Sequence, residues 1–569
     1  MVNVGIADLT LEQWRRLLRV ALGAEPADLV LRRARIVNVA SGEVEEGDIA
    51  IAYGRIVGIG DYPEGHEELD VAGSYVAPSF IDGHVHVESS LLWIDQFARA
   101  VVPHGTGAVV TDPHEIANVA GLPGIQALAE AAGKLPIGIF FTIPSCVPAS
   151  PFESAGAVLG ARAIAEGLAL PNAVALGEMM NFPGVLAGDA EIYEKLRLPA
   201  RRRDGHAPGL RGRRLNAYVA SGIGSDHEST QLEEAREKLR RGLRIMIREG
   251  STEHNLLELL PLVTDTTYPR CCFASDDRDC ATLLHDGHMD AVVRKAVAAG
   301  LDPIRAIRLA TLNTAEYWGL DGYGLVAPGY WANLVVFDRL DDIRPSLVLY
   351  KGAIVARDGQ ALFTVEQAIP EWLLDTVHVA PVDRGQLRIP ATGRLTAVEA
   401  IPGQIVTRAI EVEPTLRDGE VIADPDRDLL KLVVVERHRA TGRVGVGLVR
   451  GFGLKRGAIG SSIAHDAHNI VVVGVDDDDI LCAIDAIVSM KGGLVAVVGA
   501  EVRAKLPLPV AGILSPEPLE RVAEAYERVE QAARELGSTV PAPFALLSFM
   551  ALSVIPEARV TDQGLVVLR

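Results

Sequence analysis

The sequence contains few cysteines and no long apolar run. Its five cysteines (Cys146, Cys271, Cys272, Cys280 and Cys482) are odd in number and form no CxxC pair. This pattern argues against a disulfide framework and fits a reducing cytosol, so we expect a cytoplasmic protein. No stretch of 18 uninterrupted apolar residues occurs, so no transmembrane helix is expected. Residues 1–31 lack a basic segment followed by a long apolar run, so we expect no signal peptide there.

The chain also lacks an excess of positive charge. It has 55 Lys and Arg against 75 Asp and Glu, a formal net charge of −20. Such a balance disfavours nucleic acid or an anionic membrane as the main partner. A small-molecule substrate remains compatible with it. At 569 residues the chain is too long for a single core, so several domains are expected.

Two segments of similar texture flank a different middle region. Residues 28–75 and 324–357 alternate apolar and polar residues between glycine turns, which is typical of antiparallel strands and hairpins. We expect 28–75 and 324–384 to form one small β-sandwich domain. Residues 10–23 read as an amphipathic helix with Thr10 as its N-cap, so 1–27 is interpreted as a helical segment.

The middle region, residues 76–323, alternates short apolar strands with helical segments such as 125–134, 229–242 and 289–300. The expected strands end near Asp82, Thr111, Ile143, Gly177, Asp204, Ile223, Ile247 and Ala274. Eight strand-then-helix units of this length predict an α/β fold, a (β/α)8 TIM-like barrel. Active sites of such barrels lie at the C-terminal ends of the strands.

Residues 385–569 are predicted to form a C-terminal α+β domain. Segments such as KLVVVERH and NIVVVGV are typical of strands, whereas 478–493 and 515–537 are typical of helices. The glycine-rich stretch 445–462 contains no GxxxxGK[ST] motif and opens no clear helix. We therefore interpret that stretch as turns and bulges rather than a phosphate loop.

A histidine pair closes the first barrel strand, in VAPSFIDGHVHVESS. Residues two apart on a strand point to the same side, so His84 and His86 can reach one metal ion. Neutral imidazole suits zinc, iron, nickel and copper. Taken alone, the pair is equally compatible with two ordinary histidines at a strand end.

Polar residues at the other strand ends decide between these readings. The fourth strand ends at Glu178, the fifth at His206, the sixth at His227 and the eighth at Asp276. A single aspartate after a strand is usually a helix cap, but the whole set in barrel order is hard to obtain by chance. Further polar residues follow strands two, three and seven: His114, Glu115, Ser145 and Arg248.

This order of strand-end residues resembles the amidohydrolase superfamily. The resemblance implies two divalent metal ions at the barrel mouth. His84, His86, Glu178 and Asp276 would hold one ion. Glu178, His206 and His227 would hold the other, so that Glu178 bridges the pair.

At two positions this chain differs from well-known subgroups of the superfamily, which narrows the choice of subgroup. Many dinuclear members bridge their metals with a carboxylated lysine on strand four, but here LGEMM has Glu178 and no lysine follows until Lys195. Mononuclear adenosine deaminases carry His-Ala-Gly-Glu on strand five, whereas this chain has His-Ala-Pro-Gly at 206–209. The segments DGHVHVESS, TDPHEIANV, GEMMN, DGHAPG, SDHE and GFGLKRGAIGSSIAHDAHNI are similar to the prokaryotic adenine deaminases over nearly the whole chain.

That resemblance implies hydrolysis of adenine to hypoxanthine and ammonia, a step of purine salvage. Bound manganese or ferrous iron, with zinc also compatible, would lower the pKa of water and supply hydroxide to attack C6. Asp276 is the candidate for moving the water proton to the leaving amine. Glu178 is the candidate for protonating the ring, although a bridging carboxylate has little spare basicity; sequence leaves this division open. The resemblance also implies a homodimer or a higher homo-oligomer.

Adenine recognition needs a few donors and acceptors in an apolar slot. His114, Glu115, Ser145 and Arg248 are candidates, with loop capping as the alternative for each. In the C-terminal segment SSIAHDAHN, His465 is a further candidate, with a solvated turn as its alternative.

Two competing functions remain. A dinuclear hydrolase of cyclic amides, such as a hydantoinase or dihydropyrimidinase, is disfavoured by the missing lysine. A non-enzymatic scaffold is disfavoured by the complete ligand set.

Overall fold

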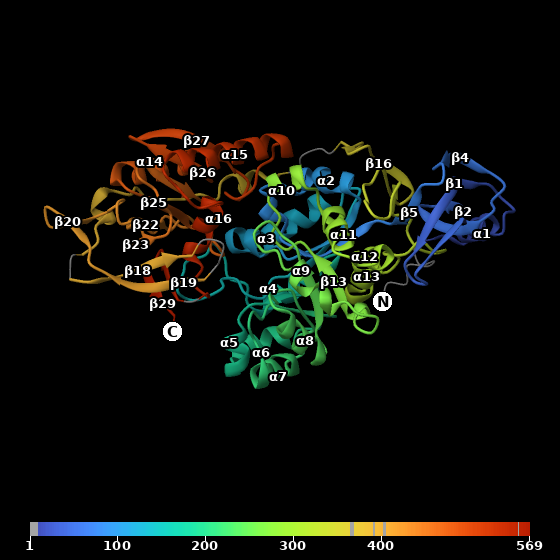
Figure 1. Cartoon of the computed structure of the whole chain (residues 1–569), viewed down its shortest axis with the longest axis horizontal. Coiled ribbons are helices and arrows are strands. Elements are labelled where there is room, and N and C mark those ends of the chain that lie inside the picture. Colours follow the sequence, from blue (N-terminus) through green and yellow to red (C-terminus); the bar gives the residue numbers. More distant parts are fainter. Residues whose placement is uncertain (1–8, 365–368, 391–392, 402–405, 556, 569) are drawn as a thin grey trace.

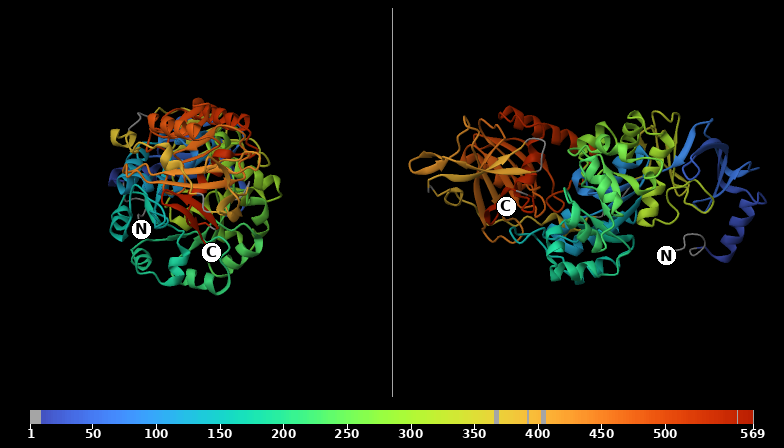
Figure 2. Two further views of the ribbon diagram at one scale, coloured as in Figure 1. Left: turned by 90° about the vertical axis from the view of Figure 1, so that its left-hand side faces the viewer. Right: turned by 60° about the horizontal axis from the view of Figure 1, so that its bottom comes forward.

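Three units follow one another along the long axis of the molecule. The computed structural model describes residues 9–364, 369–390, 393–401, 406–555 and 557–568. An N-terminal sheet (blue) lies at one end, the C-terminal unit (orange to red) lies at the other, and a barrel lies between them (Figure 1 and the right-hand view of Figure 2). Among the described residues, no helix has both the length and the apolar character needed to cross a membrane.

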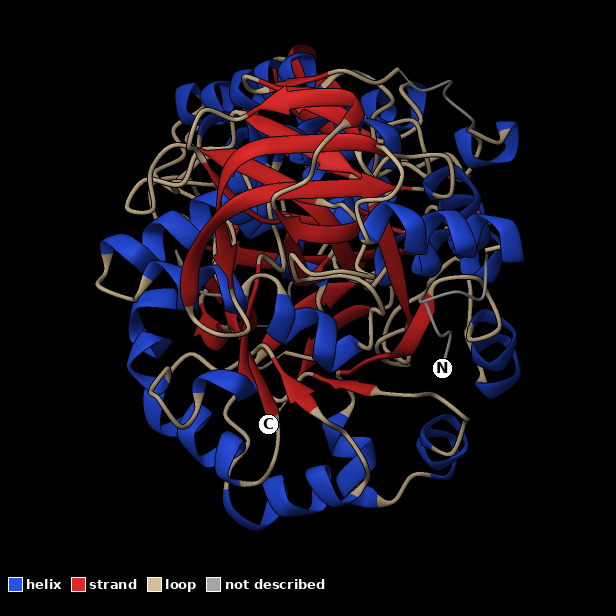
Figure 3. Cartoon of the chain, turned by 90° about the vertical axis from the view of Figure 1, so that its right-hand side faces the viewer, coloured by secondary structure: helices blue, strands red, loops and turns tan. Residues whose placement is uncertain are grey.

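The first unit joins the two β-rich flanks in one sheet. Its strands are β1 (Ala27–Asn38), β2 (Glu43–Ala52), β3 (Arg55–Gly60), β4 (Gly65–Asp70), β5 (Tyr75–Pro78), β14 (Leu334–Phe337), β15 (Leu347–Tyr350), β16 (Ala353–Arg357) and β17 (Gln360–Ala361). The order is β17-β16-β15-β14-β5-β1-β2-β3, and β4 also pairs with β1. Antiparallel pairing of β5 with β14 connects the flanks. The two parts of the expected sandwich therefore share a continuous sheet, which faces the viewer in Figure 3.

Helix α1 (Leu11–Ala21) covers this sheet at its edge. Thr10 is the N-cap, as predicted, and forms a capping box with Gln13. The reciprocal hydrogen bonds of such a box satisfy backbone donors that the first helical turn leaves free. Val20 is fully buried in a small core that includes Ala50 of β2.

Eight parallel strands form the predicted barrel. They are β6 (Phe80–Val85), β7 (Thr106–Thr111), β8 (Gly138–Ile143), β9 (Ala173–Met179), β10 (Arg203–Gly205), β11 (Ser225–Asp226), β12 (Arg244–Arg248) and β13 (Cys271–Ala274). Strands β6 to β10 pair in sequence, as do β11 to β13. Gly224 N donates to Arg203 O (3.0 Å) between β10 and β11, and a bridge between Val85 and Asp276 connects β13 to β6. The barrel is thereby closed.

The barrel strands are apolar on both faces because helices cover the outside and side chains fill the inside. Val109 and Val110 of β7 are adjacent, point to opposite faces, and are both fully buried. The surrounding helices are α2 (Ile94–Val101), α3 (His114–Ala132, kinked at Gly121), α4 (Ala161–Gly167), α5 (Phe182–Ala187), α6 (Ala190–Leu196), α7 (Gly212–Ala220), α8 (Leu232–Arg240), α9 (Leu256–Leu259), α10 (Cys280–His285), α11 (Met289–Ala298), α12 (Pro303–Leu309) and α13 (Leu312–Trp318).

The C-terminal unit is an α+β structure, as predicted. Its main sheet has the order β19-β18-β23-β22-β25-β24-β26-β27. The strands are β18 (Leu395–Ala400), β19 (Thr407–Val412), β22 (Leu430–Val435), β23 (Val444–Arg450), β24 (Ala458–Ser461), β25 (Ile470–Gly474), β26 (Gly493–Val498) and β27 (Glu501–Pro507). Two short hairpins accompany it: β20 (Thr415–Arg417) with β21 (Glu420–Ile422), and β28 (Ala558–Thr561) with β29 (Gly564–Val567). The helices are α14 (Asp477–Ser489), α15 (Leu519–Glu535) and α16 (Pro543–Ser548).

The chain joins the C-terminal unit somewhat before the boundary expected at 384/385. His378 N donates to Arg437 O (2.7 Å), and Leu387 is buried in the core between this sheet and α14. Backbone pairing and apolar burial attach this connecting segment to the third unit, although its sequence has no strand pattern.

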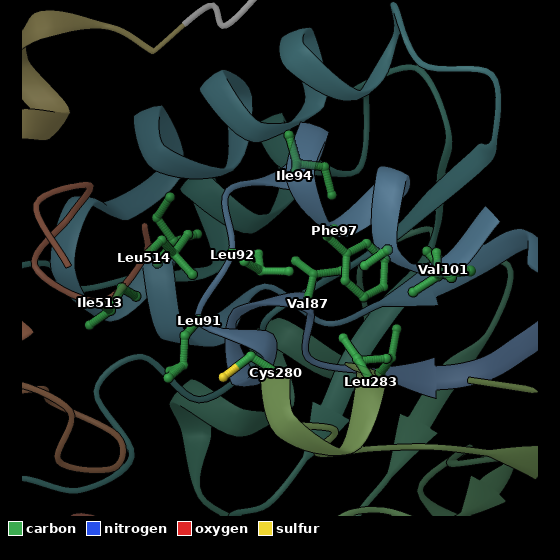
Figure 4. Packing of buried hydrophobic residues seen from close by; sticks show 14 of the residues in the cluster. Val87, Leu91, Leu92, Ile94, Phe97, Val101, Cys280, Leu283, Ile513 and Leu514 are labelled. Atoms are coloured by element: carbon green, nitrogen blue, oxygen red, sulfur yellow. The ribbon is translucent and has the colours of Figure 1, made fainter. Parts of the chain in front are cut away.

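The loop after His86 is fixed to the C-terminal unit by packing and by backbone hydrogen bonds. Leu91 and Leu92 follow the His84 and His86 pair and lie close to Ile513 and Leu514 (Figure 4). All four side chains are buried. Ser515 N donates to Leu91 O (2.7 Å), and Trp93 N donates to Ser515 O (2.8 Å). The C-terminal unit is therefore held directly beside the barrel mouth.

Candidate metal centre

Asp276 both closes the barrel and supplies a carboxylate at its mouth. Its N–H donates to His84 O (2.9 Å), and its carbonyl accepts from His86 N–H (2.9 Å). The residue has φ of 59°, in the left-handed region that aspartate tolerates better than most residues. Asp276 Oδ1 lies 3.5 Å from His84 Nε2 and 3.3 Å from His86 Nε2. Strands β6 and β13 thus bring the first and last predicted ligands together.

Hydrogen bonds on the far side of each ring orient the histidine pair. His84 Nδ1 lies 2.9 Å from Asp204 Oδ2, and His86 Nδ1 lies 2.8 Å from the carbonyl oxygen of Asp112. Because these partners accept, both Nδ1 atoms carry the proton in the neutral rings. The two Nε2 atoms therefore present lone pairs, and they are only 3.3 Å apart. Fixing one nitrogen in this way is the usual arrangement behind metal-binding histidines.

Glu178 lies at the end of β9, and each of its two carboxylate oxygens faces a different pair of histidines. Oε2 lies 2.6 Å from His206 Nδ1 and 3.4 Å from His227 Nε2. Oε1 lies 3.4 Å from His86 Nε2 and 3.3 Å from His114 Nδ1. This carboxylate is the geometric link between the two predicted ligand groups.

The donor set at the mouth fits divalent cations. Three-residue groups whose ligand atoms all lie within 4.8 Å of one another include His84, His86, Asp276 and, separately, Glu178, His206, His227. The Nε2 atoms of His84 and His86 face each other, and both lie within 3.5 Å of Asp276 Oδ1. Imidazole and carboxylate together suit manganese, iron or zinc. These groups are close enough together to hold a cation.

Arg248, at the end of β12, holds the other oxygen of Asp276. Its Nη1 lies 2.7 Å from Asp276 Oδ2 and also pairs with Glu228, while its Nε donates to Asn255 (3.2 Å). Burial alone would raise the pKa of Asp276, but the Arg248 charge and the neighbouring imidazoles hold it well below its usual value. The carboxylate is therefore ionised and fixed, with Oδ1 turned to the histidines.

Glu115 connects the barrel mouth to the C-terminal unit. It begins helix α3 beside His114, whose Nε2 lies 3.3 Å from Glu115 Oε1. Its carboxylate also lies 2.7 Å from His465 Nδ1 and pairs with His468 Nε2. His465 stacks on Phe549 with ring centroids 4.8 Å apart.

A pocket over these residues contains most of the predicted site. Among the predicted residues, its lining includes His86, His114, Glu115, Glu178, His206, His227, Arg248, Asp276 and His465. His84 is fully buried beneath it. The C-terminal unit contributes Phe549, Leu552, Val554 and Ile555, which supply an apolar wall.

Ser145 lies beside the pocket rather than in it. Its hydroxyl donates to the carbonyl of Glu178 (2.6 Å), behind the strand end. The serine therefore supports the Glu178 backbone and does not have the substrate contact expected from sequence. Lys195, the first lysine after strand four, also points elsewhere: its Nζ donates to Ser145 O (3.0 Å) and pairs with Glu191 (2.8 Å).

Several residues around the site had no individual role in the prediction from sequence. Asp204 was marked only as a strand end, although DGH places it two residues before His206; it holds the His84 ring. Asp466 and His468 lie in the histidine-rich C-terminal segment, and both are buried against the barrel mouth. The apolar wall around Phe549 had no signal, because an apolar residue in a helix looks like ordinary core.

Comparison with known proteins agrees with this geometry. The amidohydrolase family model matches residues 75–360, and the model of the adenine deaminase C-terminal domain matches residues 404–569. An adenine deaminase of Dehalococcoides mccartyi is 52% identical over 553 residues, 97% of each chain. The chain belongs to the adenine deaminase family. Within this family, adenine deaminase 2 of Carboxydothermus hydrogenoformans is 45% identical and an adenine deaminase of Methanothrix thermoacetophila 47% identical, each over 97% of both chains.

Proposed function

We propose that this protein is a metal-dependent hydrolase that converts adenine and water to hypoxanthine and ammonia. The observation that carries the proposal is the buried convergence of imidazole lone pairs and carboxylate oxygens at the barrel mouth. Near-full-length similarity to adenine deaminases supports adenine as the substrate.

His84, His86, Asp276 and Glu178 are proposed to hold one divalent ion, and Glu178, His206 and His227 the second. The separate orientation of the two Glu178 oxygens supports its bridging role. When bound, such ions lower the pKa of water so that hydroxide is available at neutral pH. Manganese or ferrous iron is the expected metal, and zinc is compatible with the same ligands.

Asp276 is proposed as the group that takes the proton of the attacking water and passes it to the leaving amine. Arg248 keeps the carboxylate ionised and leaves Oδ1 facing the histidines. Glu178 is the candidate for delivering a proton to the ring nitrogen beside C6. Its Oε2 lies 2.6 Å from His206 Nδ1, and its Oε1 faces His86 and His114 on the other side.

His114, Glu115, Arg248 and His465 are proposed to contact or frame the base. His465 is tested by His465→Ala, which we expect to raise the KM for adenine while the metal content stays unchanged. Unaltered KM and kcat in this variant would remove His465 from the substrate site.

The alternative of a cyclic amide hydrolase is disfavoured because Lys195 is paired away from the pocket. One assay separates the two activities. Manganese-loaded protein is supplied with adenine, with a hydantoin and with a dihydropyrimidine. We expect ammonia release and loss of adenine absorbance, and no ring opening. Ring opening without adenine turnover would contradict the proposal.

We also propose a cytoplasmic homodimer or higher homo-oligomer without nucleic-acid or membrane partners. The five unpaired cysteines support a reducing compartment such as the cytoplasm. The net charge of −20 disfavours nucleic acid and anionic membranes as partners. Size-exclusion chromatography with light scattering tests the oligomeric state.

A further inference from the structure

A second pocket lies beside the catalytic pocket, between the barrel and the C-terminal unit. Its walls come from the loop after His86, from the loop around Ser251 and from strands and helices of the C-terminal unit. It encloses about 760 Å³ including its opening, against about 620 Å³ for the catalytic pocket on the same measure. We call it the side chamber. On this measure the side chamber is no smaller than the catalytic pocket.

Apolar and aromatic side chains form one part of the wall of the side chamber, and polar side chains, four of them acidic, form the rest. Leu91, Leu494, Ile513, Tyr526 and Phe544 line it, and none of these five lines the catalytic pocket. Leu91 and Ile513 also belong to the packed contact that fixes the C-terminal unit to the barrel (Figure 4). An apolar, aromatic cavity with a preformed wall is suited to a flat ring system.

One wall of the side chamber is shared with the catalytic pocket. Glu115, Asp277, His465 and Phe549 line both. The rings of His465 and Phe549 are stacked with an interplanar angle of 16°, and Glu115 holds His465 Nδ1 at 2.7 Å. This aromatic pair borders both spaces and offers a planar surface for a further ring to stack upon.

Glu88 lines the side chamber with a buried carboxyl group. The side chain is only 3% exposed, and its Oε1 accepts from Ile116 N–H (3.2 Å). Its Oε2 has no hydrogen-bond partner among the described residues. Leaving a buried carboxyl oxygen unpaired is costly, so a ligand with an N–H donor gains by binding here.

We propose that the side chamber is a second binding site for a planar, amino-substituted heteroaromatic base. The aromatic walls hold the ring, and the exocyclic amine donates to Glu88. The choice of adenine as this base rests on the proposed function, because the two pockets share a wall. The site holds a second base immediately outside the catalytic pocket.

The test counts adenine molecules bound per chain. Manganese-loaded full-length Asp276→Asn protein is titrated with adenine by equilibrium dialysis, so that turnover does not deplete the ligand. Ala545→Trp in the same background fills the chamber, since Ala545 lines it and not the catalytic pocket. Ala542→Trp, at the N-cap of the same helix and lining neither pocket, is the matched control.

We expect two adenine molecules bound per chain in the Asp276→Asn protein and in the control. We expect one in the Ala545→Trp variant. Ile463→Trp, which fills the chamber from the segment after β24, replaces Ala545→Trp if the latter does not fold. A single equivalent in all three proteins, or two that the filling variant leaves intact, would overturn the second site. If the proposed function fails, wild-type protein releases no ammonia from adenine. In that case the side chamber is still detected, as one adenine bound per chain that is lost only in the variant that fills the chamber.

Discussion

At the scale of single residues, the site depends on which atom of each side chain faces the mouth. His84 and His86 direct Nε2 inward only because Asp204 and the Asp112 carbonyl accept from Nδ1. Asp276 directs Oδ1 inward because Arg248 takes Oδ2. The residues behind the ligands therefore determine the chemistry of those in front.

Replacing Asp276 by asparagine tests its role in proton transfer. Asparagine keeps the shape of the side chain but is a far weaker base, so we expect kcat for adenine to fall by at least about two orders of magnitude. Activity is measured together with metal content. Near-normal turnover at full metal occupancy would contradict the assignment.

Much of this set could be predicted from sequence because each ligand follows an apolar run at a strand end. His84, His86, Glu178 and Asp276 were all predicted as ligands in that way, and the structure brings them together at the barrel mouth. The sequence does not predict where a side chain in a turn points. Ser145 was predicted to contact the substrate, but its hydroxyl donates to the backbone carbonyl of Glu178. The contribution of Phe549 depends on contacts between residues hundreds of positions apart, which local pattern does not encode.

At the scale of elements, close strand packing positions Glu178. Gly177 precedes it on β9, and a Cβ there would lie 2.3 Å from Asp112 Oδ2 and 2.8 Å from Ile143 O. The same Asp112 oxygen accepts from Glu178 N–H (2.9 Å) and from the Thr142 hydroxyl (2.9 Å). Glycine at 177 thus lets β9 approach β7 and β8 while Asp112 orients the ligand.

Gly177→Ala is expected to lower both the melting temperature and the manganese content. The added methyl must displace Asp112 or the backbone of β8, at a cost of about 1–3 kcal/mol for overpacking. Gly160→Ala is the control, since a Cβ at Gly160 meets no atom within 4 Å. Equal stability and metal content in the two variants would disprove this account of β9.

Helix α15 carries a buried carboxyl that makes stability depend on pH. Glu530 is 4% exposed, and burial raises its pKa to about 7 from a usual value of 4.5. The unfolded chain therefore ionises first as the pH rises, and stability is lost between about pH 4.5 and 7. A difference of this size is worth about 3 kcal/mol above pH 7.

Glu530→Gln removes that loss. We expect the variant to melt at a higher temperature than the wild type at pH 8 and at a similar temperature at pH 5. Differential scanning calorimetry at the two pH values measures the effect. A wild-type protein that is as stable as the variant at pH 8 would rule out an ionised, buried Glu530.

At the scale of the whole molecule, the C-terminal unit completes the site. It is tied to the loop after His86 through Ser515, and its His465, His468 and Phe549 reach the barrel mouth. The barrel and its flanking sheet could be predicted from the sequence, because the residue patterns of strands and helices are local. The docking of the third unit follows from interdomain contacts and became visible only in the structure.

We propose that two metal ions, held by six side chains at the barrel mouth, support removal of ammonia from adenine. The most direct test titrates metal-free protein with Mn²⁺ while ammonia release from adenine and bound manganese are measured together. We expect activity to be absent without metal and to rise until two ions are bound per chain. Full activity without metal, or a plateau at one ion per chain, would contradict the account.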